Sequence, residues 1–221
     1  MADTSTNMPR NLAEAHRLLG YELYFLYTKW DYWKTLFCTD EETVDVLYST
    51  AEFFFEIYRE VLRDDMILTI CRLTDPASTN VGRATKENLT LSHLEQLVSN
   101  PDDPLSTRLK NLLSDIDRQV APFRNHRNRR LGHIDLQTRF KHPDASLPDL
   151  SIEEMEKALA LMAELLNSIE KYFDHNERPY CQGSYGNGGA KDIVRLIKDH
   201  QELERYRDER EFGPMDHDAG D

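Results

Sequence analysis

The sequence predicts an all-α fold, a helical bundle of about five helices with an extra C-terminal helix and an acidic tail. Apolar residues recur at separations of three, four and seven over several long segments, as they do on one face of an α-helix. No segment alternates apolar and polar residues in the manner of a half-buried strand. With 221 residues, of which 39% are hydrophobic, the chain can form one well-packed domain.

Two long helices are expected at the start of this bundle. Residues 1–10 are expected to be disordered, and residues 11–175 are expected to form the domain. The first helix, of about seven turns, has an apolar stripe of Leu12, Leu19, Leu23, Leu26, Trp30, Trp33 and Phe37. The second is expected from Glu42 to Leu73, with an inward face of Val44, Leu47, Ala51, Phe54, Tyr58, Leu62 and Ile70. Aromatic residues are dense in both helices, and their helical spacing favours core or dimer packing over base stacking.

A polar loop and two shorter helices should follow. Asp75-Pro76 ends the second helix, because proline restricts the residue before it, and residues 76–88 are expected to form a loop. The next apolar patterns consist of Leu91, Leu94 and Leu97, and then of Leu105, Leu109, Leu112, Ile116 and Val120. Pro122 interrupts the second pattern, so we expect a kink or a restart of the helix there.

The last part of the chain should contain two more helices. Ser151 and Glu154 fit a capping box that opens the first of them. Residues 176–189 are expected to be a Gly-rich linker, since they lack the Lys-Ser/Thr ending and the preceding strand of a phosphate-binding loop. Residues 190–207 predict a helix that docks on the bundle or on a partner. Residues 208–221 are an acidic tail that either covers a basic site or only solubilises the chain.

Charge and cysteine content exclude several classes of protein. The net charge of −13 argues against a general nucleic-acid-coating protein, so any contact with RNA should be local. Cys38, Cys71 and Cys181 are far apart, and no CxxC or HExxH motif is present, which predicts reduced thiols and no zinc site. The N-terminus has no signal-peptide pattern, and no apolar run approaches the ~20 residues of a membrane span. We therefore expect a cytoplasmic protein.

Cationic residues gather in one ten-residue stretch, from Arg124 to His133. It contains four arginines, two histidines and no acidic residue. Arginine matches phosphate oxygens with a planar fork of donors, and histidine titrates near neutrality. In RNA the 2′-hydroxyl can attack the neighbouring phosphorus, so a catalyst needs a proton-transfer group and a cation for the developing charge. His133 could be the first and Arg127 the second.

The spacing Arg127-Asn128-x4-His133 can form a site if the backbone turns after the helix. With Arg127 in the last helical turn and a bend at Gly132, His133 would fold back beside Arg127 and Asn128. An Arg-to-His pair at a single separation is weak evidence by itself. The alternative is that the arginines form surface ion pairs and that His133 caps a helix.

This Arg-Asn-x4-His motif, after a long amphipathic segment, resembles the signature of the HEPN superfamily of small all-α proteins. The stretches Leu62 to Pro76 and Asn88 to Leu91 resemble its AbiU2-like branch, which is associated with abortive infection of phage-infected bacteria. The resemblance covers residues 12–175 best. It implies a metal-independent endoribonuclease of a phage-defence or toxin–antitoxin system, with no cofactor.

The resemblance also implies partners and site residues. RNA is the expected substrate, and a homodimer would bring two motifs to one cleft, with an antitoxin or another defence protein as a further partner. By position, Arg127 and His133 match the catalytic pair and Asn128 the polar residue. Some HEPN proteins do not cut RNA, so a non-catalytic interaction or regulatory module stays an alternative, as does nucleic-acid or nucleotide binding without cleavage.

Five further residues are assigned around the motif. Arg124 and Arg130 are expected to hold flanking RNA phosphates. Asp65 and Arg72 share a face of the second helix and could pair with each other. Together with Asp75 they either orient the catalytic residues or only form salt bridges and a cap at the helix end.

Overall fold

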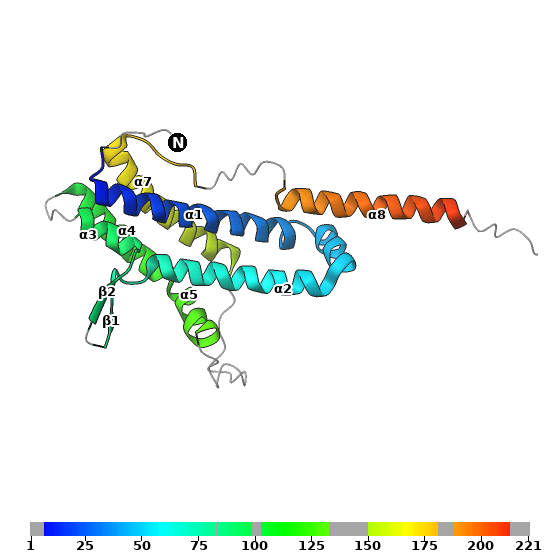
Figure 1. The fold of residues 1–221 in the computed structure, drawn as a ribbon, viewed down its shortest axis with the longest axis horizontal. Helices are drawn as coiled ribbons and strands as arrows, with labels where there is room; N and C mark the ends of the chain where they lie inside the picture. The colour runs from blue at the N-terminus through cyan, green and yellow to red at the C-terminus, as the bar shows by residue number, and fades with distance from the viewer. Residues whose placement is uncertain (1–6, 83, 99–102, 133–149, 181–187, 213–221) are drawn as a thin grey trace, which may run out of the picture. The chain divides into compact units, whose positions relative to one another are not determined.

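The structure, a computed structural model, describes residues 7–82, 84–98, 103–132, 150–180 and 188–212. Its helices are α1 (Arg10–Phe37), α2 (Glu41–Thr74), α3 (Leu91–Val98), α4 (Pro104–Gln119), α5 (Ala121–His126), the π-helical turn η1 (Arg127–Leu131), α7 (Ile152–Asp174) and α8 (Ala190–Phe212) (Figure 1). The predicted all-α fold is confirmed. No helix in the described ranges is both long and apolar enough to cross a membrane.

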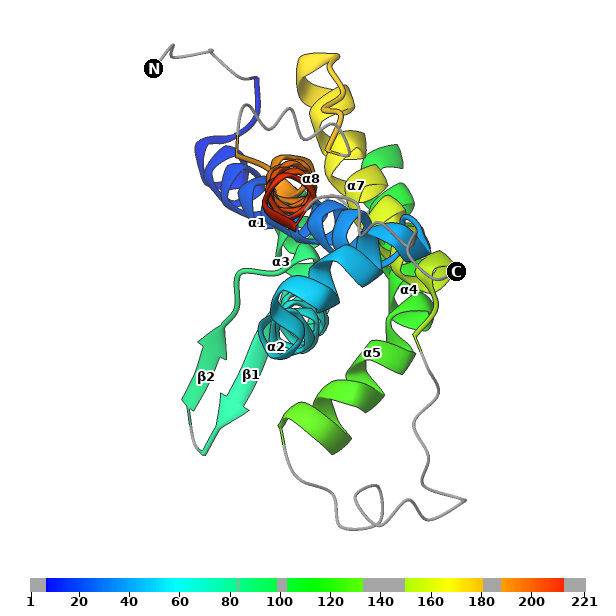
Figure 2. The same ribbon diagram turned by 90° about the vertical axis from the view of Figure 1, so that its right-hand side faces the viewer.

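A short hairpin interrupts the helices where a polar loop was predicted. Strands β1 (Ser78–Val81) and β2 (Ala84–Glu87) pair in antiparallel register (Figure 2). Gly82 has a φ of 63°, which a glycine adopts at little cost in a tight turn. The expectation of no strand is therefore wrong. Four-residue strands that are polar and exposed carry no apolar alternation from which they could be predicted.

The long helix α2 follows its prediction in extent but not in the phase of its apolar face. At Ala51 the backbone leaves the helical conformation, with φ −158° and ψ 67°. Beyond this kink Phe55 is buried, with 5% exposure, whereas Phe54 is 62% exposed. The prediction that Phe54 faces inward is wrong, because counting by helical period assumes an uninterrupted helix.

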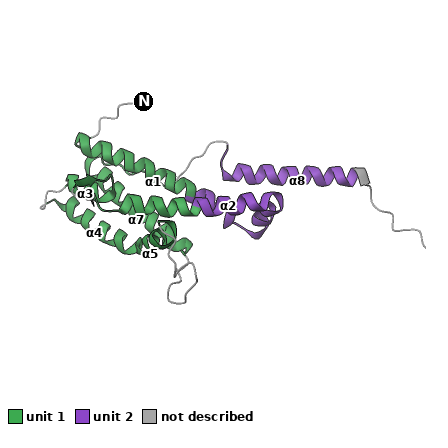
Figure 3. Ribbon diagram, turned by 60° about the horizontal axis from the view of Figure 1, so that its bottom comes forward, with its two compact units in different colours: residues 1–29, 63–183 green, residues 30–62, 184–221 purple. Residues whose placement is uncertain are grey.

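The described elements belong to two compact units, shown in Figure 3. Unit 1 comprises residues 1–29 and 63–183, and unit 2 comprises residues 30–62 and 184–221. The sequence placed residues 11–175 in one domain, but the structure assigns the middle of that range to the unit of α8. Helices α1 and α2 each contribute to both units, and a continuous helix gives no sequence signal of such a division.

Unit 1 is a helical bundle in which α4 packs against α7 and α3 against α4. Its fully buried side chains include Leu94, Leu109, Phe123, Leu159, Met162 and Leu166. The capping box of α7 is confirmed. The Ser151 hydroxyl accepts from the Glu154 amide (3.1 Å), and the Glu154 carboxylate accepts from the Ser151 amide (2.8 Å). These contacts satisfy amides that the first helical turn leaves without partners.

Unit 2 has a small core of its own. Its buried residues are Leu36, Leu47, Phe55 and Ala190. Val194 and Ile197 of α8 pack against this core, and Lys198 lies 2.8 Å from the Glu42 carboxylate. The helix predicted after the linker therefore packs on other residues of the same chain.

Both ends of the described chain are more ordered than predicted. The Asn7 backbone amide donates to Asp174 (2.8 Å), and its side-chain amide donates to the carbonyl of Phe173 (3.1 Å). The expected disorder of residues 1–10 is thus wrong for residues 7–10, which tertiary hydrogen bonds hold in place.

At the other end, α8 continues to Phe212, so residues 208–212 of the expected acidic tail are helical. An Arg207–Glu204 pair at 2.7 Å, one turn apart, supports this exposed part of the helix. The remainder of the tail, residues 213–221, and the middle of the Gly-rich linker lie outside the described residues.

Candidate functional site

The packing of α5 determines the direction in which the arginines of the basic motif point. Helix α4 ends at Gln119, and α5 begins with Pro122 in its first turn, which confirms the expected restart. Phe123 is fully buried and His126 is 8% exposed, so these two side chains anchor one face of α5 in unit 1. Arg124 and Arg127 follow them by one residue each, and their guanidinium groups reach the C-terminal end of α2.

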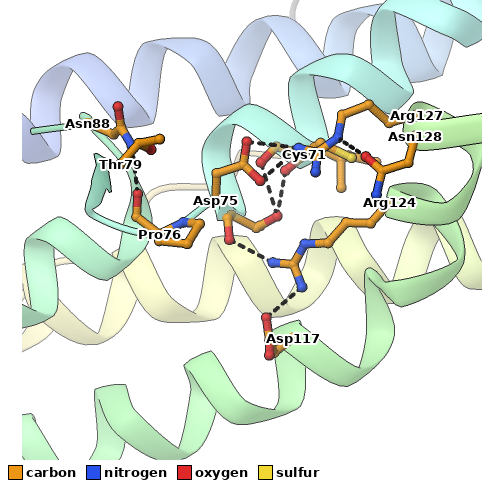
Figure 4. Close-up of polar contacts among 11 residues, drawn as sticks. Cys71, Asp75, Pro76, Thr79, Asn88, Asp117, Arg124, Arg127 and Asn128 are labelled. Carbon is orange, nitrogen blue, oxygen red and sulfur yellow. Dashed lines mark hydrogen bonds and ion pairs between the residues drawn. The ribbon is translucent and has the colours of Figure 1, made fainter. Parts of the chain in front are cut away.

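Arg127 is held by one partner directly after α2 and by one from its own turn. Its Nη1 donates to both carboxylate oxygens of Asp75, at 2.7 and 2.8 Å, and its Nε donates to Asn128 Oδ1 at 3.0 Å (Figure 4). The hydrogen bonds with Asp75 hold the pKa of Arg127 above its usual value. The side chain is 26% exposed. Arg127 is therefore a permanent cation with a fixed orientation and one accessible side.

Arg124 has a different set of contacts. Its Nη2 donates to the carbonyl of Thr74, the last residue of α2, at 2.7 Å, and its Nη1 donates to Asp117 of α4 at 2.6 Å (Figure 4). It satisfies a carbonyl that the helix end leaves without an amide partner. Arg124 thus joins α2 to α4, and its side chain is 23% exposed, about as much as that of Arg127.

Electrostatics explain why two arginines meet at this point. The C-terminus of α2 carries the negative end of the helix dipole, and Asp75, which follows it directly, adds a formal negative charge. Arg124 and Arg127 offset both charges. Asp117, which pairs with Arg124, was not assigned to the site from the sequence. The separation of seven residues is the signal that could have found it, because it corresponds to about two helical turns.

The other assigned residues are divided among separate ion pairs. Arg130 lies 3.5 Å from Asp64, and not beside Asp75. Asp65 pairs with Lys29 of α1 at 2.5 Å, and Arg72 lies 3.8 Å from Glu22. The expected Asp65–Arg72 pair is wrong, because α1 offers each of them a closer partner of opposite charge. Of the three supporting residues, only Asp75 contacts Arg127.

Cys71 lies one turn before Asp75 and was not assigned to the site from the sequence. Its side chain is buried close to Arg127, and burial raises the pKa of this thiol to about 11, although the two nearby arginines act in the opposite direction. It stays protonated near neutral pH and is not a nucleophile. The separation of four residues from Asp75 is the signal that could have placed it here.

The end of the basic motif differs from the expected bend. Gly132 has right-handed helical angles, φ −81° and ψ −34°, and its amide donates to the carbonyl of Arg127 at 2.6 Å. This bond spans five residues and defines the π-helical turn η1, a feature that often marks functional sites. A Cβ at position 132 would lie 3.2 Å from the Arg127 oxygen, so glycine provides space here. His133 lies outside the described residues.

The described part of this arrangement can bind an anion through a fixed guanidinium. Within the described ranges, no group of three His, Cys, Asp or Glu side chains could hold a metal ion.

Comparison with known proteins identifies one relationship. The family model HEPN_AbiU2, described as AbiU2, matches residues 10–209. No curated protein and no solved structure matches the chain. The matched range begins with α1 and ends within α8, and it includes the whole basic motif.

Proposed function

The chain belongs to the AbiU2 family of HEPN proteins, which is related to abortive infection, and on this premise we propose that it is a metal-independent endoribonuclease. We place it in a phage-defence or toxin–antitoxin system. The basic motif supplies the reacting residues, and RNA is the substrate.

One observation carries this proposal: the guanidinium of Arg127 is fixed in orientation. Asp75 holds Nη1 and Asn128 holds Nε, whereas Nη2 makes no hydrogen bond to any described residue. A cation with two nitrogens held and a third available suits a phosphate oxygen whose charge grows in the transition state. Prior orientation matters because the cation need not reorganise during the reaction.

The proposed reaction needs only side chains of the chain and the RNA itself. The 2′-oxygen forms a bond to the adjacent phosphorus, and the bond to the 5′-oxygen breaks. The products are a 2′,3′-cyclic phosphate and a 5′-hydroxyl. Arg127 stabilises the added negative charge on the phosphorane oxygens, and His133 transfers the proton that leaves the 2′-hydroxyl or joins the 5′-oxygen. Asp75 and Asn128 position Arg127.

A homodimer is part of this proposal, and unit 2 carries a surface that supports it. Phe53, Ile57 and Val61 follow one another at four-residue spacing on α2, with exposures of 80%, 50% and 59%. Residues at this spacing share one helical face. A contiguous apolar face on an otherwise charged chain is typical of a protein–protein contact. We assign it to a second copy of the chain.

The test incubates end-labelled RNA with the purified protein in EDTA and identifies the product ends. Arg127→Ala and His133→Ala should each abolish cleavage at a temperature where the variants are folded, although Arg127→Ala also loses the hydrogen bonds to Asp75 and Asn128 and should unfold at a lower temperature. Arg118→Ala is the matched control, because Arg118 is an exposed arginine of α4 whose partner is Asp115. Wild-type cleavage that leaves 2′,3′-cyclic ends supports the proposal. An inert wild type across several RNAs refutes it.

A second candidate function is a non-catalytic interaction module. It is favoured by apolar residues on the exposed side of α8, with Ile193, Leu196, Leu203 and Tyr206 each at least 43% exposed. In that case the Arg127–Asp75 pair would only fasten α5 to α2. Arg127→Ala would then lower the free energy of unfolding and weaken partner binding, and neither the variant nor the wild type would cleave RNA.

A further inference from the structure

The β1–β2 hairpin does not contribute to the core of unit 1. All four residues of β2 are exposed, as are Ser78, Thr79 and Asn80 of β1. A two-stranded hairpin is at best marginally stable in water by itself, and the described side chains of both strands are exposed. Its presence therefore needs an explanation other than packing.

The base of the hairpin is clamped next to the candidate site. The Asn88 side chain donates to the carbonyl of Pro76 at 2.9 Å and to Thr79 Oγ1 at 2.7 Å, and its backbone amide donates to the carbonyl of Ala77 at 2.7 Å. Pro76 directly follows Asp75, the carboxylate that holds Arg127 (Figure 4). In Figures 1 and 2 the hairpin, which follows α2, and α5, which follows α4, both extend toward the lower edge of the view.

Acidic residues are scarce in both projecting segments of this acidic chain: the hairpin has one, Glu87, at the end of β2, and the basic motif has none. The protein has 40 aspartates and glutamates and a net charge of −13, yet none of these residues occurs from Pro76 to Lys86 or from Arg124 to His133. In sequence, the hairpin segment carries two cations, Arg83 and Lys86. The base of the hairpin and the two arginines of α5 and η1 are both held at the C-terminal end of α2, and the scarcity of acidic residues in these segments reduces the repulsion of a polyanion.

The two faces of the hairpin differ in chemistry. Thr79 and Lys86 are cross-strand partners, so their side chains share a face, and Asn88 extends it with a hydrogen bond to Thr79. Glu87 lies on the opposite face, across from Ser78. The first face offers an ammonium, a hydroxyl and an amide, which are groups that contact phosphates and sugar hydroxyls. It offers no aromatic ring for base stacking, so its recognition is independent of sequence.

We propose that the β1–β2 hairpin is an arm that binds the phosphate backbone of single-stranded RNA through the face of Thr79 and Lys86. This inference rests on the proposed function, because the arm holds the strand that Arg127 acts on. The arm extends the site from one phosphate to several. The enzyme should therefore prefer strands that continue beyond the nucleotides on either side of the cleaved bond.

The test measures RNA binding separately from cleavage. Fluorescence anisotropy is followed with a 5′-fluorescein 2′-O-methyl RNA of about 20 nucleotides, longer than most single-strand sites, which cannot be cleaved because it has no 2′-hydroxyl. One variant replaces residues 78–87 by two glycines, which is feasible because the Asn88 amide lies 2.7 Å from the Ala77 carbonyl. A second variant is Lys86→Ala. The control is Lys110→Ala, since Lys110 is an exposed lysine of α4 that pairs with Glu95.

Loss of the hairpin should weaken binding at least about tenfold, and Lys86→Ala about threefold, with the slope of log K against log salt reduced by about 0.7. Lys110→Ala should bind like the wild type. Equal affinity of the hairpin-less protein, or no RNA binding by the wild type, overturns the inference, as does a hairpin-less protein that loses only a protein partner. RNA binding through the hairpin without cleavage of ordinary RNA would refute the ribonuclease proposal alone. Cleavage with unchanged affinity in the hairpin-less protein would refute only the arm.

Discussion

The C-terminal end of α2 and its middle differ in the surroundings of their side chains. At its C-terminal end in unit 1, charged groups are paired: Arg127 binds Asp75, and Arg124 binds the Thr74 carbonyl. In its middle, in unit 2, Phe53 and Ile57 are open to solvent. On an ordinary surface helix, charged side chains are mostly exposed to solvent and large apolar side chains are mostly buried. Both regions of α2 depart from this pattern. Under the proposed function, the first region takes part in the reaction and the second contacts a partner.

The largest effect is expected at the apolar region. Ile57→Glu should weaken dimerisation by about 100-fold, because it would bury an unpaired carboxylate in the contact. Sedimentation at micromolar concentration should then detect monomers, and circular dichroism should show an unchanged helix content. Leu196→Glu on α8 is the matched control, because Leu196 is also an exposed aliphatic residue and lies outside the proposed contact. If it alone gave monomers, the second copy would be bound by α8 instead.

At the charged region, Asp75→Asn tests orientation separately from charge. The amide can accept one hydrogen bond from Arg127 but cannot hold Nη1 with two anionic oxygens. RNA cleavage should fall by about 10- to 100-fold, as is usual when an orienting partner is lost. Dimerisation should not change. A decrease in cleavage no larger than that of Arg118→Ala would show that Asp75 has no part in the reaction.

Arg124→Ala separates structural from catalytic roles within the basic motif. It removes hydrogen bonds to Thr74 and Asp117, so the free energy of unfolding should fall by about 1–2 kcal/mol in a urea titration. Cleavage at a temperature where the variant is folded should decrease only a few-fold. A loss as complete as that of Arg127→Ala would mean that Arg124 also contacts the RNA.

The last prediction concerns Cys71 and the dependence of stability on pH. Its pKa is about 11 in the folded chain, above the ordinary value of a thiol, so the unfolded chain loses this proton first as the pH rises. The contribution of Cys71 to stability is therefore intact below about pH 8.5 and declines up to pH 11. The stability curve of Cys71→Ser should lack this decline. Parallel curves for the two proteins would contradict the assignment.

The sequence alone was sufficient for the helices that depend on local rules. Periodicity located α1, the restart at Pro122 followed from the missing amide of proline, and the spacing of Ser151 and Glu154 marked the start of α7. The resemblance to the AbiU2 family was confirmed over residues 10–209. The kink at Ala51 and the hairpin escaped prediction because neither leaves a periodic trace.

Within the site, the residue types and the motif were determined by sequence, but the pairing of charges was decided by the tertiary structure. The chain contains 27 basic and 40 acidic residues, so each arginine has many carboxylates from which a partner could come. Coulomb energy depends on distance, and the distances between α2 and α5 exist only after packing. Because Phe123 is buried, Arg124 and Arg127 point toward the end of α2. Asp65 and Arg72 pair with residues of α1 and do not contact Arg127. The sequence determined that a cationic stretch exists, and packing decided that Asp75 holds Arg127.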